Sequence, residues 1–123
     1  MKLPDVGDIA WVDLDDTRGS EQSGRRPALV LTPLSFHQRS RRAVICPITS
    51  KVRDWPTNIV LPHGLRTKGM IMVDQVRSID REERLFETIE KVPPAIVREV
   101  RIKLADLLGI ETDGPPPSGL DRA

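Results

Sequence analysis

Two adjacent arginines, Arg25 and Arg26, are the residues whose type and position most clearly suggest chemistry in this chain. They follow the small, polar segment GSEQSG, which carries Glu21, and they are followed by Pro27. Because proline restricts the preceding residue to extended backbone, it fixes the direction of Arg26. A guanidinium stays protonated at any working pH and presents a planar set of donors that match carboxylate or phosphate oxygens. This stretch is therefore a candidate site for holding an anionic substrate.

The remaining charge is distributed unevenly along a chain of 123 residues whose formal net charge is only +1. Basic residues also gather at 39–42 and 51–53, and acidic residues at 13–16 and 80–83. A uniformly basic, nucleic-acid-coating protein is excluded by this balance. If the basic segments converge on one face of the fold, they create a local anion-binding surface despite the balanced total.

The elements that must position these residues are mostly strands. Short apolar or alternating runs bounded by Pro, Gly or Asn predict strands at 7–14, 28–32, 43–48, 58–61, 70–76 and 85–89. Strands of this length and spacing are typical of a small barrel or a coiled open sheet. Pro47 interrupts one run, which predicts a sheet edge or a bulge there.

One helix is expected, over residues 93–109. Its apolar residues recur at helical spacing and form one stripe, which predicts packing against the sheet, while Ile102 lies off the stripe. The stripe consists of Ile96, Val97, Val100, Leu104, Leu107 and Leu108. Beyond residue 110 the chain is rich in Pro and Gly and is predicted to be disordered, so we expect one domain over residues 1–110 and a tail over 111–123.

Several familiar sites are excluded by the residues present. His37 and His63 lack the spacing of a metal site and are interpreted as solvated loop residues, and no metal or cofactor is expected. No glycine-rich nucleotide loop occurs. Cys46 lies within an apolar run and is interpreted as a core residue. No apolar run is long enough for a membrane span, no disulfide can form within the chain, and a cytoplasmic protein is the expectation.

Three sequence blocks resemble the MazF/PemK family of toxins from type II toxin–antitoxin systems. The first is GDIAWVDLDDTRGSEQSGRRPALVLTP, the second is VICPITSKVRDWPTNIVL, and the third is MIMVDQVRSID. The blocks occur in the family's order and, with the closing helix, extend over residues 7–109. The combination of GSEQ, a following Arg-Pro pair and the later DQVRS is highly specific.

This resemblance implies a mainly β fold, an SH3-like small barrel with a C-terminal helix packed on the sheet, that works as a homodimer. It also implies a metal-independent, sequence-specific endoribonuclease that cleaves single-stranded RNA. The products would carry a 2′,3′-cyclic phosphate and a 5′-hydroxyl. The implied partners are the mRNA substrate and a cognate MazE-like antitoxin.

The family's essential arginine and threonine match Arg26 and Thr49. The arginine can stabilise the charge that develops on phosphate, and the threonine can donate its hydroxyl to the same group or orient the attacking 2′-OH. The general base stays open, with Glu21 as the natural candidate because arginine is a poor proton acceptor. Further RNA-binding candidates are Arg25, Lys51, Arg53, Gln75 and Arg77.

Two other classes of function remain as alternatives. A toxin of the same fold could poison a protein target such as DNA gyrase without cleaving RNA, but such relatives lack the pair matched by Arg26 and Thr49. A peptide-binding SH3-like module would need an aromatic-lined groove. The chain has no Tyr, two Trp and two Phe, which offers little of one.

Overall fold

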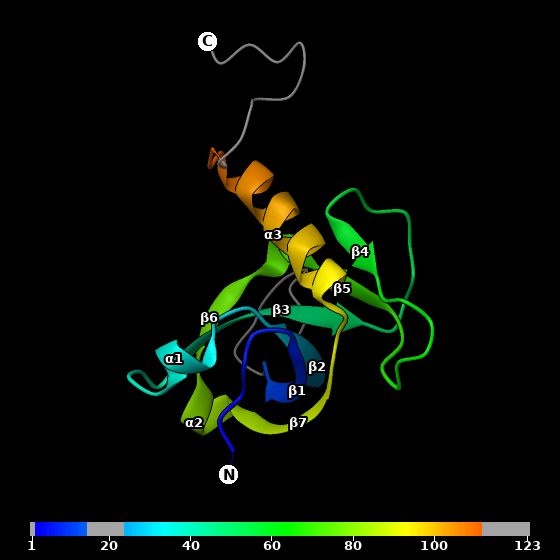
Figure 1. The fold of residues 1–123 in the computed structure, drawn as a ribbon. Coiled ribbons are helices and arrows are strands. Elements are labelled where there is room, and N and C mark those ends of the chain that lie inside the picture. The colour runs from blue at the N-terminus through cyan, green and yellow to red at the C-terminus, as the bar shows by residue number, and fades with distance from the viewer. Residues whose placement is uncertain (1, 15–23, 112–123) are drawn as a thin grey trace.

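A computed structural model describes residues 2–14 and 24–111, and its elements follow one another as seven strands and a few helices (Figure 1). The strands are β1 (Asp8–Asp13), β2 (Arg25–Val30), β3 (Arg42–Thr49), β4 (Asn58–Val60), β5 (Met70–Met72), β6 (Arg77–Asp80) and β7 (Leu85–Lys91). The helices are α1 (Leu34–His37), the 3-10 turn η1 (Val73–Gln75), α2 (Arg81–Arg84) and α3 (Pro94–Leu108).

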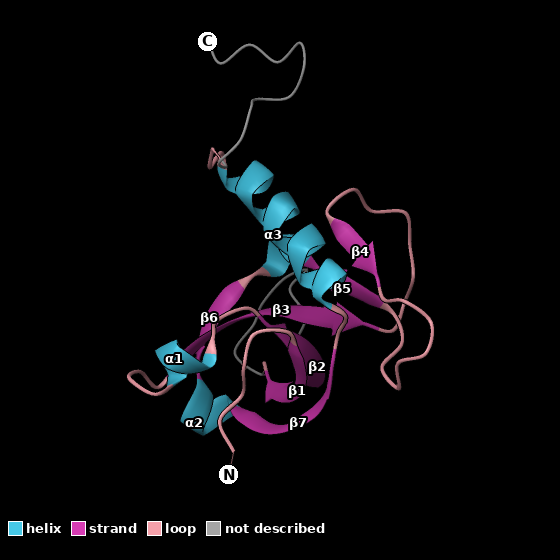
Figure 2. Cartoon of the chain, in the orientation of Figure 1, coloured by secondary structure: helices cyan, strands magenta, loops and turns pink. Residues whose placement is uncertain are grey.

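All strand pairs are antiparallel, and the sheet follows the order β4-β5-β3-β2-β1-β7, with β6 also paired to β3. The sheet curls into a small, open barrel with α3 packed across it (Figure 1). The expected fold class is confirmed. The two shortest α-helices, α1 and α2, lie together away from the C-terminal end of α3 (Figure 2).

The prediction that Pro47 marks an edge or a bulge is wrong, because β3 is the central strand of the sheet. On one side of β3, Pro47 lies opposite Ala28 of β2. On the other side, β3 pairs with β6 as far as Ile45 and with β5 from Ile48 onward. Pro47 therefore falls where β3 exchanges one partner for another, a position at which its missing N–H costs no ladder hydrogen bond.

Two strand boundaries also differ from the sequence prediction. β2 begins at Arg25, three residues before the expected start, so both arginines belong to the strand. The run at 70–76 is not one strand, because β5 ends at Met72 and η1 turns the chain before β6. The break lets β5 and β6 pair with different ends of β3.

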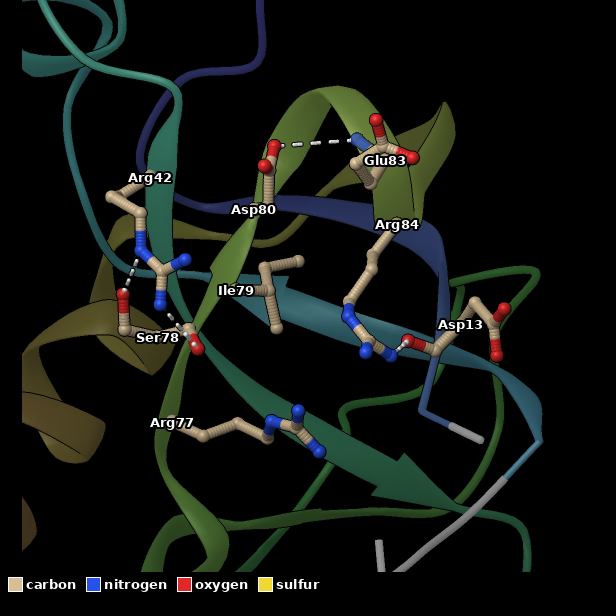
Figure 3. A pocket seen from close by; sticks show the side chains of 8 residues that line it. All are labelled: Asp13, Arg42, Arg77, Ser78, Ile79, Asp80, Glu83 and Arg84. Atoms are coloured by element: carbon tan, nitrogen blue, oxygen red, sulfur yellow. Dashed lines mark hydrogen bonds between the residues drawn. The ribbon is translucent and has the colours of Figure 1, made fainter. Parts of the chain in front are cut away.

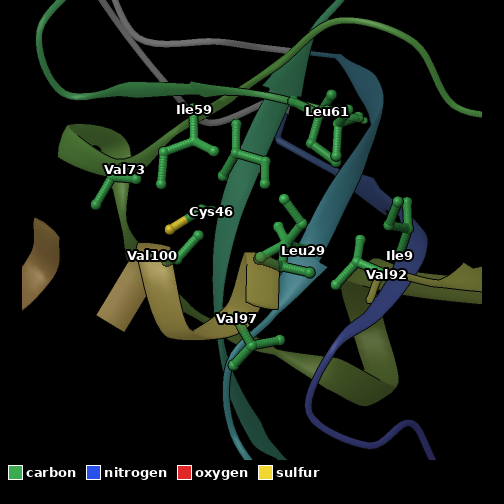
Figure 4. Packing of buried hydrophobic residues seen from close by; sticks show 12 residues of the cluster. Ile9, Leu29, Cys46, Ile59, Leu61, Val73, Val92, Val97 and Val100 are labelled. Carbon is green, nitrogen blue, oxygen red and sulfur yellow. The ribbon is translucent and has the colours of Figure 1, made fainter. Parts of the chain in front are cut away.

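The apolar core consists of two clusters, one on each face of the curled sheet. The first contains residues of the central strands together with Ile96, Val97 and Val100 of α3 (Figure 4). The second lines the concave interior of the sheet and includes Val12, Ala28, Ile45 and Ile79. Burying a side chain of this size contributes about 1.5–3 kcal/mol relative to leaving it exposed.

Helix α3 confirms the sequence prediction at its ends but not along its whole stripe. Gly109 takes a left-handed conformation with φ of 69° at the C-cap, which glycine adopts without steric cost. Leu107 and Leu108 are 45% and 59% exposed, so the predicted stripe packs on the sheet from Ile96 to Leu104 but not at its last two leucines. Ile102, which lies off that stripe, is 59% exposed.

His37 is not the solvated loop residue that the sequence suggested. It is 2% exposed, and its two ring nitrogens lie 2.7 Å from the carbonyl oxygen of Pro4 and 2.7 Å from the hydroxyl oxygen of Thr32. These contacts tie α1 to the N-terminal segment and to the end of β2. The histidine is therefore a structural residue, while His63 is exposed as expected.

Candidate active site

Strand pairing brings Arg26 and Thr49 to the same end of the sheet. β2 and β3 pair with Ala28 opposite Pro47, and the same register continued by two residues places Arg26 opposite Thr49. Because side chains alternate along a strand, both residues share the sheet face of Ala28 and Ile45. The arginine and threonine singled out by the sequence are thus cross-strand neighbours at the open end of the barrel.

Thr49 is held in place at the end of β3. It is 5% exposed, and its hydroxyl oxygen accepts a hydrogen bond from the backbone N–H of Lys51 at 3.2 Å. This contact uses one lone pair, so the hydroxyl hydrogen remains able to donate. The backbone of Gly69 passes so closely that a Cβ built there would lie 1.9 Å from the carbonyl oxygen of Thr49. Glycine is therefore required at this crossing of the two chains.

Arg26 also lines a cleft of about 550 Å³, which is called the basic cleft below. Four cationic side chains line it, and none of its described lining residues is acidic. Its apolar surface comes from Trp11, Pro27, Ile48 and Ile89, and its cations from Arg25, Arg26, Arg66 and Lys68. Trp11 is half-buried at the wall of this cleft. Cations beside an apolar wall suit a nucleotide, whose phosphate needs charge and whose base needs a flat apolar contact.

The cations of segment 62–69 were missed by the sequence analysis. Glu90 of β7 accepts hydrogen bonds from the backbone N–H groups of Arg66 (3.0 Å) and Thr67 (2.7 Å) and from the Thr67 hydroxyl (2.7 Å). Desolvation opposes ionisation of this carboxyl, yet these hydrogen bonds hold its pKa below the usual value. The carboxylate anchors the segment beside β7 and so brings Arg66 and Lys68 to the cleft.

Arg25 projects differently from Arg26. Its guanidinium carbon lies 4.0 Å from the centre of the Phe86 ring, a cation–π contact with β7. The side chain is exposed and remains part of the wall of the basic cleft. Arg25 is therefore oriented by an aromatic ring, and its charge still faces the cleft.

Two further basic candidates, Lys51 and Arg53, lie in the exposed segment that follows Thr49. The backbone N–H of Arg53 lies 3.2 Å from the sulfur of Met70, and the indole N–H of Trp55 donates to Asp74 at 3.1 Å. These contacts tether the segment to β5 and η1. Neither basic side chain lines the basic cleft, although Ser50, the residue before Lys51, does.

The last two RNA-binding candidates follow β5. Gln75 belongs to η1, where its amide nitrogen lies 3.6 Å from the sulfur of Met72. Arg77 begins β6 and lines a second cleft of about 540 Å³, distinct from the basic cleft. The structure therefore separates Arg77 from Arg25 and Arg26.

Three expectations concern other site residues. Glu21, the candidate general base, lies outside the described residues. Within the part of the chain that is described, no group of three or more His, Cys, Asp or Glu side chains could hold a metal ion. Cys46 is buried in the core, as expected, and burial raises the pKa of its thiol to about 12, so it is no nucleophile.

Comparison with known proteins identifies the family. The family described as "PemK-like, MazF-like toxin of type II toxin-antitoxin system" matches residues 5–108. This chain belongs to that family. The endoribonuclease toxin MazF of Escherichia coli (strain K12) is 36% identical over 107 residues, which cover 87% of this chain and 96% of that protein.

Solved structures agree with this assignment. The crystal structure of a MazF from Deinococcus radiodurans has a TM-score of 0.85 at 36% identity and covers 89% of this chain and 100% of that chain. A MazE–MazF crystal structure from the same organism has a TM-score of 0.77 at 32% identity, covering 90% of this chain and 100% of the matched chain. The MazF-like fold is therefore shared over nearly the whole described chain.

Proposed function

We propose that this chain is an endoribonuclease toxin that cleaves single-stranded RNA. The observation that carries the proposal is that Arg26 lines the basic cleft and that the β2–β3 register, continued two residues beyond the Ala28–Pro47 pair, brings it opposite Thr49. The relative MazF of Escherichia coli is named an endoribonuclease toxin, which supports the same activity here. The gyrase-binding alternative would make no use of this arginine–threonine pair.

The reaction we infer is attack by a ribose 2′-OH on the adjacent phosphorus. Its transition state places extra negative charge on the phosphoryl oxygens, and a guanidinium fixed by a strand and a following proline can stabilise that charge without reorganisation. The Thr49 hydroxyl can donate to the same phosphate. The products would be a 2′,3′-cyclic phosphate and a 5′-hydroxyl, and Glu21 remains the candidate for the base that removes the 2′ proton.

The proposed function is tested by incubating the purified chain with a single-stranded RNA pool of defined sequence and mapping the ends. Cleavage at a small set of sequences, with cyclic phosphate at the new 3′ ends, is the expected result. The matched variant Thr49→Val keeps the side-chain shape without the hydroxyl and should lose about a hundredfold in rate, the typical effect of removing one transition-state donor. An intact RNA pool after prolonged incubation with folded protein would contradict the proposal.

The partners we propose are an antitoxin and a second copy of the chain. A MazE–MazF complex among the structural relatives supports the antitoxin. Exposed apolar side chains gather at the C-terminal end of α3, which supports self-association through that end: Ile102, Leu107, Leu108 and Ile110.

In the described part of the chain, no helix is long and apolar enough to span a membrane. We place the protein in the cytoplasm, where its mRNA substrate is found.

An acidic antitoxin segment is expected to occupy the basic cleft and so to compete with RNA. The cleft's four cations and apolar wall suit a peptide that carries both carboxylates and apolar side chains. Titrating an antitoxin peptide against a fluorescent, non-cleavable RNA bound to the protein should displace the RNA completely. Salt should weaken RNA binding more steeply than antitoxin binding, because phosphate contacts release counterions. Independent, simultaneous binding of the two would refute the overlap.

A further inference from the structure

Among residues 2–14 and 24–111, Trp55 has the largest apolar side chain that is exposed, at 52%. It lines neither the basic cleft nor the second cleft. Exposure alone assigns no role, because single apolar side chains are common on protein surfaces. Trp55 differs from such residues in two ways: its indole is held in one orientation, and its segment starts at the candidate active site.

The ring of Trp55 is oriented by contacts at its edge and along its backbone. The indole N–H donates to a carboxylate oxygen of Asp74 in η1 at 3.1 Å. The Trp55 carbonyl oxygen accepts a hydrogen bond from the backbone N–H of Asn58 at 3.0 Å, which closes a turn at the start of β4. Pro56 follows and restricts Trp55 to extended backbone. A hydrogen bond at the ring edge does not cover a ring face, so the indole is a flat apolar surface with a fixed direction.

The segment that carries this ring begins at Thr49. Thr49 ends β3 and Trp55 lies six residues further along, so their Cα atoms are at most about 20 Å apart. The segment does not extend away from the sheet, because the backbone N–H of Arg53 contacts the sulfur of Met70, which is opposite Thr49 in the ladder. A stacked single strand covers 20 Å in about six nucleotides at about 3.4 Å each, and small barrels that bind single strands contact about 4–16.

The charges around Trp55 favour a base over a phosphate. Lys51 and Arg53 are the cations of the segment, and Asp54 and Asp74 are the anions beside the ring. All four side chains are exposed, and their charges balance. A phosphate is selected by an excess of positive charge, which this surface lacks. A base is selected by a flat apolar face, which every base can stack on whatever its sequence.

We propose that Trp55 stacks on a base of the bound RNA, at a nucleotide that flanks the cleavage site, and that Asp74 positions the indole for this contact. The inference rests on the proposed RNA cleavage and adds a base contact outside the basic cleft. Stacking tolerates any base, so the contact fixes where the strand lies without reading its sequence. It forms equally in the ground state and in the transition state, so it strengthens substrate binding and leaves the rate of the bound complex unchanged.

The test removes one base at a time from an RNA oligonucleotide by placing an abasic ribose. A 2′-deoxyribose at the cleavage site allows binding to be measured without reaction. With the wild-type protein, an abasic residue at one flanking position should weaken binding about tenfold, the effect of losing one stacked base. With Trp55→Leu, intact RNA should bind about tenfold more weakly, and the abasic residue at that position should cost nothing further. Abasic residues at other positions should keep their effects.

Cleavable RNA gives a second readout on the same variants. Trp55→Leu should raise KM about tenfold and leave kcat nearly unchanged, the pattern of a lost contact that does not change in the transition state. Trp55→Phe keeps an aromatic face and should retain most of the affinity. Circular dichroism establishes that each variant folds. If Trp55→Leu does not fold, Trp55→Met, which also lacks an aromatic ring, takes its place.

The matched control is Val60→Thr, which removes apolar surface from a neighbouring position on β4 that is 54% exposed. It offers no aromatic face in either form, so the full tenfold effect of the abasic residue should remain. A second control lies at the other end of β3, where Arg42 donates to the Ser78 hydroxyl at 3.1 Å beside the second cleft (Figure 3). Arg42→Gln removes a charge far from the ring and should leave the position and size of the abasic effect unchanged.

The positioning role of Asp74 has its own test. Asp74→Asn keeps an oxygen that accepts the indole N–H, so it should retain most of the abasic effect, whereas Asp74→Ala should reduce it. If Asp74 served only the stability of the fold, both variants would unfold at lower temperature with the abasic effect intact. Rescue by asparagine therefore separates orientation of the ring from general stability.

Four results would overturn the inference. In the first, Trp55→Leu retains the full penalty of every abasic residue. In the second, its RNA affinity is unchanged while its antitoxin affinity falls, which would assign Trp55 to a protein partner. In the third, it lowers kcat and leaves KM unchanged. In the fourth, the wild-type protein neither binds nor cleaves RNA, so that the proposed function fails and this inference with it. The first three leave wild-type cleavage intact, so they are distinguishable from a failure of the function itself.

Discussion

Arg26→Ala is expected to abolish RNA cleavage and to leave the fold intact. The side chain is half-buried near the start of β2, where the β2–β3 register, continued two residues beyond the Ala28–Pro47 pair, brings it opposite Thr49. Its loss removes the cation that would stabilise the phosphorane-like transition state, an effect of about a hundredfold or more in rate. Single-turnover cleavage of a mapped RNA, together with circular dichroism and thermal unfolding, measures both parts of this expectation.

Arg25→Ala is the matched control, because it removes the same charge from the neighbouring residue. Arg25 lies over the Phe86 ring, and because side chains alternate along β2 it points to the opposite sheet face from Arg26. Its replacement should weaken RNA binding several-fold and leave the rate of the bound complex nearly unchanged. Wild-type activity in Arg26→Ala, or an equal loss of single-turnover rate in both variants, would overturn the role assigned to Arg26.

The sequence could predict the fold class because its signals are local. Alternation at 7–14, the helical stripe before Gly109 and the Pro and Gly boundaries each reflect the conformation of a few neighbouring residues. The exchange of partners along β3 could not be predicted in this way. It depends on which distant strands pair with each half of β3. Because Pro47 lies between these two pairings, a proline that would indicate a sheet edge is tolerated in the central strand.

The same distinction between local and long-range signals applies to the residues of the candidate site. Arg26 and Thr49 were recognised from a motif, but their approach depends on the β2–β3 register, which is non-local. Arg66 and Lys68 were missed because their place at the basic cleft depends on Glu90, more than twenty residues further along the chain. The only local signal was that two basic residues, Arg66 and Lys68, stand just before Gly69. A glycine is required there because the backbone of Gly69 passes close to the backbone of Thr49.

Replacing one ribose by deoxyribose, at the nucleotide on the 5′ side of the scissile phosphate, is expected to stop cleavage completely. In the reaction we propose, the nucleophile is the 2′-OH of that ribose, held next to phosphorus at high effective concentration by the substrate itself. The phosphates and bases are unchanged, so this RNA should still bind with nearly wild-type affinity. Gel analysis of cleavage and a fluorescence binding assay on the same oligonucleotide measure the two effects.

The same mechanism predicts that excess chelator leaves the cleavage rate unchanged. The guanidinium of Arg26 supplies the positive charge at the phosphate, and the Thr49 hydroxyl supplies a second donor, so neither charge stabilisation nor nucleophile generation is assigned to a metal ion. An RNA with deoxyribose at any other position is the control and should be cleaved at the normal rate.

Normal cleavage of the RNA with deoxyribose at the scissile nucleotide would mean that water, not the 2′-OH, attacks the phosphorus. Loss of activity with chelator would mean that a metal ion does the work assigned to Arg26. Either result would require a different mechanism for this site, even if RNA remained the substrate.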